Sequence, residues 1–181
     1  MNVCVFAGAS EEVEEVYKAA AFEVGTAMAC KGFTLVFGAG NTGMMGAVCR
    51  GVLSAKGAAI GIVPGFFKGE VLFSDSEIEI ITTESMRQRK QIMDEKSDAV
   101  IVLPGGIGTL DEFFEVLTLK QLKRLNKPIM VLNTNGFYDK MISMLQGIID
   151  ESFAHDSIRD LFYIHDDHSA LVDALAKKLG Y

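Results

Sequence analysis

The sequence predicts an α/β protein, a single-domain Rossmann-like open parallel sheet with helices on both faces. Short apolar segments alternate along the chain with longer segments whose apolar residues recur at helical spacing. The short segments are apolar at consecutive positions rather than at every second one, which is typical of strands buried on both faces. The 181 residues match the length of about one domain, and no linker, repeat or low-complexity stretch divides them. We therefore expect one domain over 1–181.

Each expected strand is a short apolar segment that ends at a glycine, a proline or a polar turn. The expected strands are, in chain order, 3–7, 34–37, 58–63, 99–103, 129–132 and 162–164. The strand over 99–103 is strongly apolar, with three consecutive β-branched residues at 100–102. The long stretch 64–78 is expected to be irregular, and loops of this length in a compact domain are usually functional.

Each expected helix lies after one of these strands, or just before one, and repeats apolar residues every three or four positions. The expected helices are, in chain order, 11–31, 44–56, 86–96, 110–124, 137–151 and 169–179. Ser10 is expected to cap the first helix, and Gly32 is expected to end it. This alternation of strands and helices is the pattern of a parallel sheet covered on both sides.

The composition limits the partners and the compartment. With 17 basic and 24 acidic residues the net charge is −7, so the chain has no general attraction for nucleic acid or an anionic membrane. No stretch approaches the roughly 20 apolar residues of a membrane span, and no signal peptide is expected. Cys4, Cys30 and Cys49 are odd in number and widely spaced, which favours reduced, buried thiols in a cytoplasmic protein.

The turns after the strands are where an open α/β sheet binds ligands. Most of them contain glycine, which lets a ligand approach the backbone, although tight turns also need glycine for their own sake. Gly38-x-Gly40-x-x-Gly43 matches the dinucleotide fingerprint by its letters. It follows the second strand rather than the first, and no acidic residue lies between Asn41 and Gly69 to hold a ribose. This turn is therefore not expected to bind NAD, although facing another nucleotide stays open to it.

The segment 104–112 follows the strand over 99–103 and opens a helix. Free amides at a helix N-terminus, together with those of a glycine loop, favour a bound phosphate, to which Thr109 can add a hydroxyl. No Gly-Lys-Ser/Thr follows, so a single phosphate is expected rather than a triphosphate. Thr109-x-x-Glu112 is also the pattern of a capping box, which is the alternative structural interpretation. Asp111 and Glu112 would repel a phosphate unless they face the other end of the ligand.

Three cations occur within four residues at 87–90, near the start of a helix, where the helix dipole disfavours them. An exposed, solvated face is the simplest interpretation, and we prefer it for Arg87. For one of the other two, Arg89 or Lys90, the alternative is a role as a hydrogen-bond donor to a phosphate or a leaving group.

Together these motifs resemble the LOG ("Lonely Guy") family, long labelled "possible lysine decarboxylase". The resemblance rests on Met86-x-x-Arg89-Lys90 followed by Pro104-Gly105-Gly106-x-Gly108-Thr109-x-x-Glu112. It extends over nearly the whole chain, through the opening strand Val3-Cys4-Val5-Phe6, the turn Gly38 to Gly46, Pro64 with the downstream Glu70, and the helix 112–121. Departures include Gly8-Ala9-Ser10, which runs directly into an acidic helix, and Ala39 within a turn that is often all glycine.

The resemblance implies hydrolysis of the N-glycosidic bond of a cytokinin riboside 5′-monophosphate or of AMP, giving the free base and ribose 5-phosphate. It implies that Arg89 and Glu112 are catalytic. It implies substrate contacts by Glu70, Lys90, Gly106, Ile107, Gly108, Thr109, Leu110, Asp111 and Thr118. The turn glycines Gly8, Gly40, Gly43 and Gly105 are added as substrate-binding candidates from their positions after the strands. The resemblance also implies a homodimer with the site near the interface.

The chemistry agrees with the residues, because a carboxylate such as Glu112 can stabilise the oxocarbenium-like ribose and position water. No metal and no cofactor are expected, and nothing marks a Schiff-base lysine for a pyridoxal decarboxylase. A non-catalytic nucleotide- or cofactor-binding protein on the same scaffold is the alternative. The preferred base is left open.

Two further groups of residues have alternative interpretations. His165-Asp166-Asp167-His168 is more typical of an exposed helix start than of a metal site. Phe66, Phe67 and Phe73 lie in the long irregular stretch, where they either close over a purine or pack a dimer interface.

Overall fold

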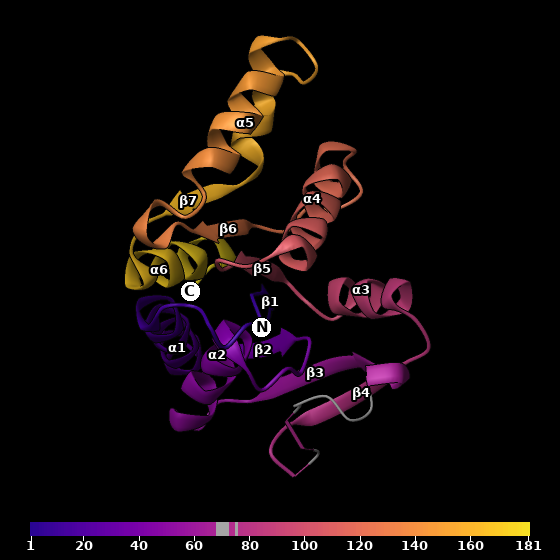
Figure 1. Cartoon of the computed structure of the whole chain (residues 1–181), viewed down its shortest axis with the longest axis vertical. Coiled ribbons are helices and arrows are strands. Elements are labelled where there is room, and N and C mark those ends of the chain that lie inside the picture. Colours follow the sequence, from indigo (N-terminus) through magenta and orange to yellow (C-terminus); the bar gives the residue numbers. More distant parts are fainter. Residues whose placement is uncertain (68–72, 75) are drawn as a thin grey trace.

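The computed structural model describes residues 1–67, 73–74 and 76–181. In it a parallel sheet forms the centre of the molecule (Figure 1). The strands are β1 (Asn2–Phe6), β2 (Thr34–Phe37), β3 (Ala59–Pro64), β4 (Glu79–Thr83), β5 (Ala99–Val102), β6 (Ile129–Leu132) and β7 (Tyr163–His165). Their order is β4-β3-β2-β1-β5-β6-β7, and every described pairing is parallel. This confirms the predicted fold class.

Helices cover both faces of the sheet. The helices are α1 (Glu15–Cys30), α2 (Gly43–Ser54), α3 (Met86–Glu95), α4 (Ile107–Gln121), α5 (Asp139–Asp150) and α6 (His168–Leu179). One apolar core joins the sheet to α1, α2 and α6, which lie together in Figure 1, and a second core joins it to α3, α4 and α5. Successive strand residues point alternately into the two cores, as Cys4 and Val5 do, which explains why the strands are apolar throughout. No helix in the described part of the chain is long and apolar enough to cross a membrane.

Three differences between the expected and the observed elements are the most important. Strand β4 was not predicted, although its sequence is rich in β-branched residues. Within the described part of the chain it is an edge strand whose one partner is β3. Helix α1 begins at Glu15, and its N-cap is Glu14 rather than Ser10, whose Oγ accepts a hydrogen bond from the Glu12 amide instead. Helix α4 begins at Ile107, three residues before the predicted start.

The sheet order places a topological switch point between β1 and β5. From β1 the chain adds β2, β3 and β4 on one side, and then returns to add β5, β6 and β7 on the other. At such a point the loops after the two central strands diverge, which leaves a crevice at the carboxyl edge. The turns after β1 and β5 therefore flank the place where a ligand is expected.

Candidate active site

Backbone hydrogen bonds join the turn after β1 both to the turn after β5 and to the start of α2. The Gly8 amide donates to the Pro104 carbonyl (3.1 Å), and the Gly8 carbonyl accepts from the amide of Met45 at the start of α2 (3.0 Å). The two turns also approach closely, since a Cβ on Gly105 would lie 2.8 Å from the Gly8 nitrogen. Gly8 and Gly105 thus allow two backbones to meet at the switch point.

The N-terminus of α4 lies in the turn after β5. Gly106 is the N-cap residue and has no side chain that could cap the helix. The amide of Leu110 makes the first helical hydrogen bond, to the Gly106 carbonyl. The amides of Ile107, Gly108 and Thr109 precede it, in the positions that lack helical acceptors. Among the residues that the structure describes, a Cβ on Gly106 or Gly108 would meet nothing within 4 Å, so these residues leave space open beside the turn. The geometry suits an anion.

The capping-box interpretation of Thr109 and Glu112 is wrong. Because α4 begins at Ile107, Thr109 is its third residue and is buried, and no side chain caps the helix. Glu112 lies further along the helix, where its side chain is turned toward α3 instead. The helix start, rather than the spacing of the two residues, decides between the two interpretations.

Arg89 lies on α3 and is buried, with 8% of its surface exposed. Its Nε donates to the carbonyl of Ile62 in β3 (3.1 Å), and its Nη1 lies 3.2 Å from Oε1 of Glu112. Its Nη2 lies against Gly38, so closely that a Cβ added to that glycine would be 2.1 Å from this nitrogen. The structure therefore brings together Arg89 and Glu112. It adds the Ile62 carbonyl, which the sequence did not reveal, and Gly38, which the sequence assigned to a turn that faces a nucleotide.

The environment of Glu112 makes its carboxyl group a weaker acid than usual. Burial raises the pKa of Glu112 to about 7, while the nearby Arg89 guanidinium opposes that rise. A carboxyl group with a pKa near neutrality can exchange a proton at physiological pH, which suits a general acid or base.

Lys90 follows Arg89 and pairs with two other carboxylates of α4. Its Nζ lies 3.0 Å from Asp111 Oδ2 and 2.5 Å from Glu115 Oε2, and these carboxylates raise the pKa of Lys90. Arg87 is exposed, as predicted. Of the two cations that remained open, Arg89 is therefore the one buried beside the catalytic candidate Glu112.

Thr118 is not brought beside the Arg89–Glu112 pair. Its hydroxyl donates to the Phe114 carbonyl (2.7 Å), and it lines a shallow hollow on the outside of α4 together with Lys90, Asp111 and Glu115. A cavity of about 270 Å³ lies between α3 and α4 and shares Lys90 and Glu115 with this hollow. Its lining includes Glu112, with Phe6 and Val116 among the apolar residues.

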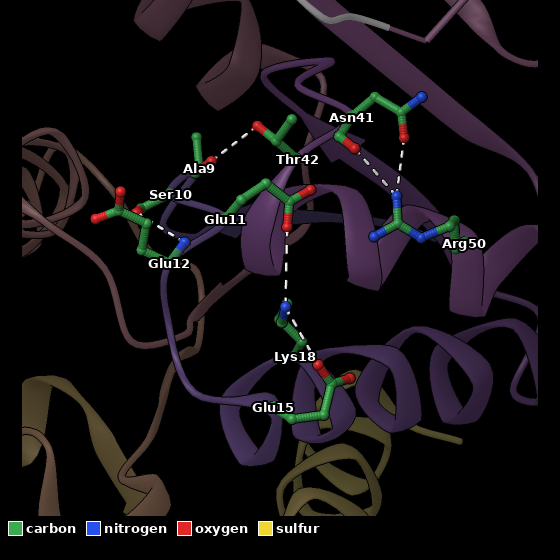
Figure 2. A network of polar contacts seen from close by, with 9 residues as sticks. All are labelled: Ala9, Ser10, Glu11, Glu12, Glu15, Lys18, Asn41, Thr42 and Arg50. Atoms are coloured by element: carbon green, nitrogen blue, oxygen red, sulfur yellow. Dashed lines mark hydrogen bonds and ion pairs between the residues drawn. The ribbon is translucent and has the colours of Figure 1, made fainter.

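The loop after β1 packs on the turn before α2, as Figure 2 shows. The Thr42 hydroxyl donates to the Ala9 carbonyl (2.8 Å), and Arg50 binds the carbonyl and side chain of Asn41. Gly43 has a φ of 55°, and a Cβ there would lie 2.5 Å from the Ser10 carbonyl oxygen. The close packing of this loop therefore requires glycine at position 43. Gly40 is also close to a neighbour, since a Cβ there would lie 2.9 Å from the Met45 sulfur.

Other sequence candidates have different outcomes. Glu70 lies outside the described residues. Phe73 is buried in the core and packs edge-on against Phe37, whereas Phe66 is 63% exposed. Asp167 caps α6 by accepting a hydrogen bond from the Ala170 amide. Cys30 is exposed, unlike the expected buried thiol.

Another residue that the motifs did not reveal supports the turn after β5. Tyr138 is almost fully buried, and its hydroxyl donates to the Leu103 carbonyl (2.7 Å). Its own amide donates to Oδ1 of Asn133 (2.7 Å). A tyrosine among apolar residues gives no sequence signal for this contact, because its partner is a backbone atom far along the chain.

Comparison with known proteins places this arrangement among related chains. A family model described as possible lysine decarboxylase matches residues 45–175. A rice protein named probable cytokinin riboside 5′-monophosphate phosphoribohydrolase LOGL5 is 38% identical over 87% of this chain, which spans 64% of that protein. The cytokinin riboside 5′-monophosphate phosphoribohydrolase of Mycobacterium tuberculosis is 37% identical over 92% of this chain and 88% of its own length.

Solved structures share the fold. The molybdenum cofactor carrier protein of Chlamydomonas reinhardtii superposes with a TM-score of 0.74 at 24% identity, covering 99% of this chain and 98% of its own. At this identity the likeness concerns the fold alone, since one fold hosts many functions.

Proposed function

Since this chain belongs to the LOG family, whose model is described as possible lysine decarboxylase, we propose that it is a nucleoside 5′-monophosphate phosphoribohydrolase. It hydrolyses the N-glycosidic bond of a purine nucleotide, which is a cytokinin riboside 5′-monophosphate or AMP, and it releases the free base and ribose 5-phosphate. The relatives' names support the reaction class.

The observation that carries the proposal is the buried pair of Arg89 and Glu112, whose Nη1 and Oε1 atoms lie 3.2 Å apart. Breaking the C1′–N bond leaves positive charge on the ribose while the bonding electrons leave with the base. The ionised carboxylate of Glu112 stabilises that charge and accepts a proton from the water whose oxygen bonds to C1′. The departing base takes up a proton in turn, so that it is released as the neutral free base. Arg89 supplies guanidinium donors to the ribose, the phosphate or the departing base.

The 5′-phosphate is proposed to bind the first amides of α4. Gly106 to Thr109 present a helix N-terminus with open space beside it, and a phosphate there gains from both the amides and the helix dipole. Decarboxylation of lysine is not proposed, because it needs a lysine that forms a Schiff base within a dedicated site. Lys90 is instead held by Asp111 and Glu115.

We further propose a homodimer that forms through α3 and α4. The resemblance implies that Thr118 contacts substrate, yet in one chain Thr118 lies on the outside of α4 in the hollow lined by Lys90 and Asp111. If a second copy of the chain packs on this face, Thr118 of one copy lies near the Arg89–Glu112 pair of the other. The three free cysteines support a reducing compartment, such as the cytoplasm.

The test is a panel of nucleoside 5′-monophosphates that includes AMP and isopentenyladenosine 5′-monophosphate. Free base is separated by chromatography for the wild type and for Glu112→Gln. We expect base release by the wild type and a loss of about 10²–10⁴-fold in the variant, the range for removal of a general acid–base group. Binding of AMP, measured by calorimetry, should persist in Glu112→Gln. The member of the panel that turns over fastest identifies the preferred base.

A wild type that binds AMP saturably but releases no base from any nucleotide would contradict the proposal. That outcome would favour a non-catalytic nucleotide-binding protein on the same scaffold, and the site to examine next would then be the short loop from Gly8 to Ser10.

A further inference from the structure

We propose that Gly38 is a positioning residue that seats the guanidinium of Arg89 for catalysis, an inference that rests on the proposed function. Gly38 directly follows β2, and Arg89 reaches it from α3. The sequence gives this glycine a different meaning, since it opens a turn that resembles a nucleotide-binding fingerprint. In the structure, what adjoins Gly38 is a protein side chain.

The contact is closer than any side chain at position 38 would permit. A Cβ on Gly38 would lie 2.1 Å from Nη2 of Arg89 and 3.2 Å from its Cζ. Non-bonded carbon and nitrogen atoms do not approach so closely, so even alanine must displace the guanidinium. The backbone of Gly38 has no positive φ that would itself demand glycine. The need for glycine at this position therefore comes from the arginine.

Two further bonds fix the guanidinium on its other sides. Nε donates to the Ile62 carbonyl (3.1 Å), and Nη1 pairs with Glu112 (3.2 Å). Gly38, β3 and α4 thus contact the planar group on three sides and restrain its orientation. A methyl group at position 38 would push Nη2 away and strain both bonds, because the guanidinium moves as a rigid plane.

The structure also explains why the fold should tolerate the change. The atom that a new Cβ would meet first is the far end of a long, flexible side chain. The arginine can move, whereas the backbone around Gly38 need not. We therefore expect Gly38→Ala to fold and to lose activity, since a misplacement of about 1 Å in a catalytic group can cost about 100-fold in rate.

The decisive experiment compares wild type, Gly38→Ala, Arg89→Ala and the double variant. With AMP or the best nucleotide of the panel, kcat should fall about 100-fold in Gly38→Ala. In the Arg89→Ala background the same substitution should cost less than about twofold, because the group that it displaces is already gone. Gly147→Ala is the matched control: it lies on α5, a Cβ there meets nothing within 4 Å, and it should leave kcat unchanged.

A second readout does not depend on turnover. The Arg89 charge lowers the pKa of Glu112, so displacing it should raise that pKa, as followed by carbon NMR of the carboxyl group. We expect the same upward direction in Gly38→Ala and Arg89→Ala, and no additional rise in the double variant. Full additivity in kcat, or an unchanged pKa of Glu112 in Gly38→Ala, would overturn the inference.

The two proposals fail separately. If the wild type releases no base and the pKa of Glu112 is raised in Gly38→Ala, the proposed reaction is contradicted and the positioning of Arg89 by Gly38 is supported. A wild type that is active, together with a Gly38→Ala variant of unchanged kcat, would keep the reaction and remove the positioning role of Gly38.

Discussion

The Nη1 nitrogen of Arg89 lies 3.2 Å from Oε1 of Glu112, and each side chain is about nine-tenths buried. Removing a carboxylate from water is costly, and a single guanidinium offsets only part of that cost. The pKa of Glu112 therefore remains raised, to about 7, despite its partner. This relationship ties the ionisation of one side chain both to the proposed reaction and to the stability of the fold.

The first prediction concerns the pH dependence of activity. If the ionised form of Glu112 is the reactive one, kcat/KM should rise with pH and reach half of its maximum near pH 7. The measurement is kcat/KM for the best nucleotide from about pH 5 to about pH 9. A profile that is flat over this range would show that the protonation of Glu112 does not control the reaction.

The second prediction concerns the pH dependence of stability. The folded pKa of Glu112 is raised from 4.5 to about 7, so the folded protein binds more protons than the unfolded chain between these values. Its contribution to the free energy of unfolding should therefore decrease as the pH rises through this window, by up to about 3 kcal/mol. Urea unfolding of the wild type and Glu112→Gln at about pH 5 and pH 8 measures it. An equal change in both proteins would exclude Glu112 as the source.

The third prediction separates two neighbouring glycines. Gly106 adjoins open space, so Gly106→Ala should leave the fold stable while its methyl group intrudes on the proposed phosphate site. We expect KM to rise about tenfold, which corresponds to about 1.4 kcal/mol of lost binding. At Gly105 a Cβ would lie 2.2 Å from Thr109 Oγ1, so Gly105→Ala should lower stability as well. Steady-state kinetics and urea unfolding distinguish the two. An unchanged KM in Gly106→Ala would place the phosphate elsewhere.

The fourth prediction concerns Tyr138. Tyr138→Phe removes the 2.7 Å hydrogen bond to the Leu103 carbonyl inside the protein. The loss of a buried partner should lower the free energy of unfolding by about 1–3 kcal/mol. Tyr163→Phe is the control, since Tyr163 is 37% exposed. Urea unfolding of both variants checks the expectation, and equal effects would mean that the contact with Leu103 contributes nothing.

The fifth prediction concerns the crossing of α1 and α2. A Cβ on Gly25 would lie 2.0 Å from the Val48 carbonyl oxygen, and one on Gly51 would lie 2.0 Å from that of Phe22. These are backbone atoms in helices and cannot move aside cheaply. Gly25→Ala and Gly51→Ala should each destabilise the protein by about 3 kcal/mol. Gly147→Ala, in an open position on α5, should be neutral or stabilising. Thermal unfolding tests all three, and a stable Gly25→Ala would contradict the close crossing.

The sequence by itself determined the fold class and most of the elements. Apolar segments such as 99–102 and 129–132 are buried on both faces, so their hydrophobicity shows in any local window. Edge strand β4 is only partly buried, and it was missed although its β-branched residues were a usable signal. The motifs around Arg89 and Glu112 also identified the two residues that the fold brings together.

Only the tertiary structure decided how that pair is held. The capping-box pattern of Thr109 and Glu112 is correct in its letters, yet the helix starts at Ile107 and the Glu112 side chain turns to α3. Gly38, the Ile62 carbonyl and the Tyr138 hydroxyl act across contacts between residues far apart in the chain. Local sequence records the periodicity of burial within an element, whereas these contacts depend on how separate elements meet. Their roles therefore become visible only when the chain is folded.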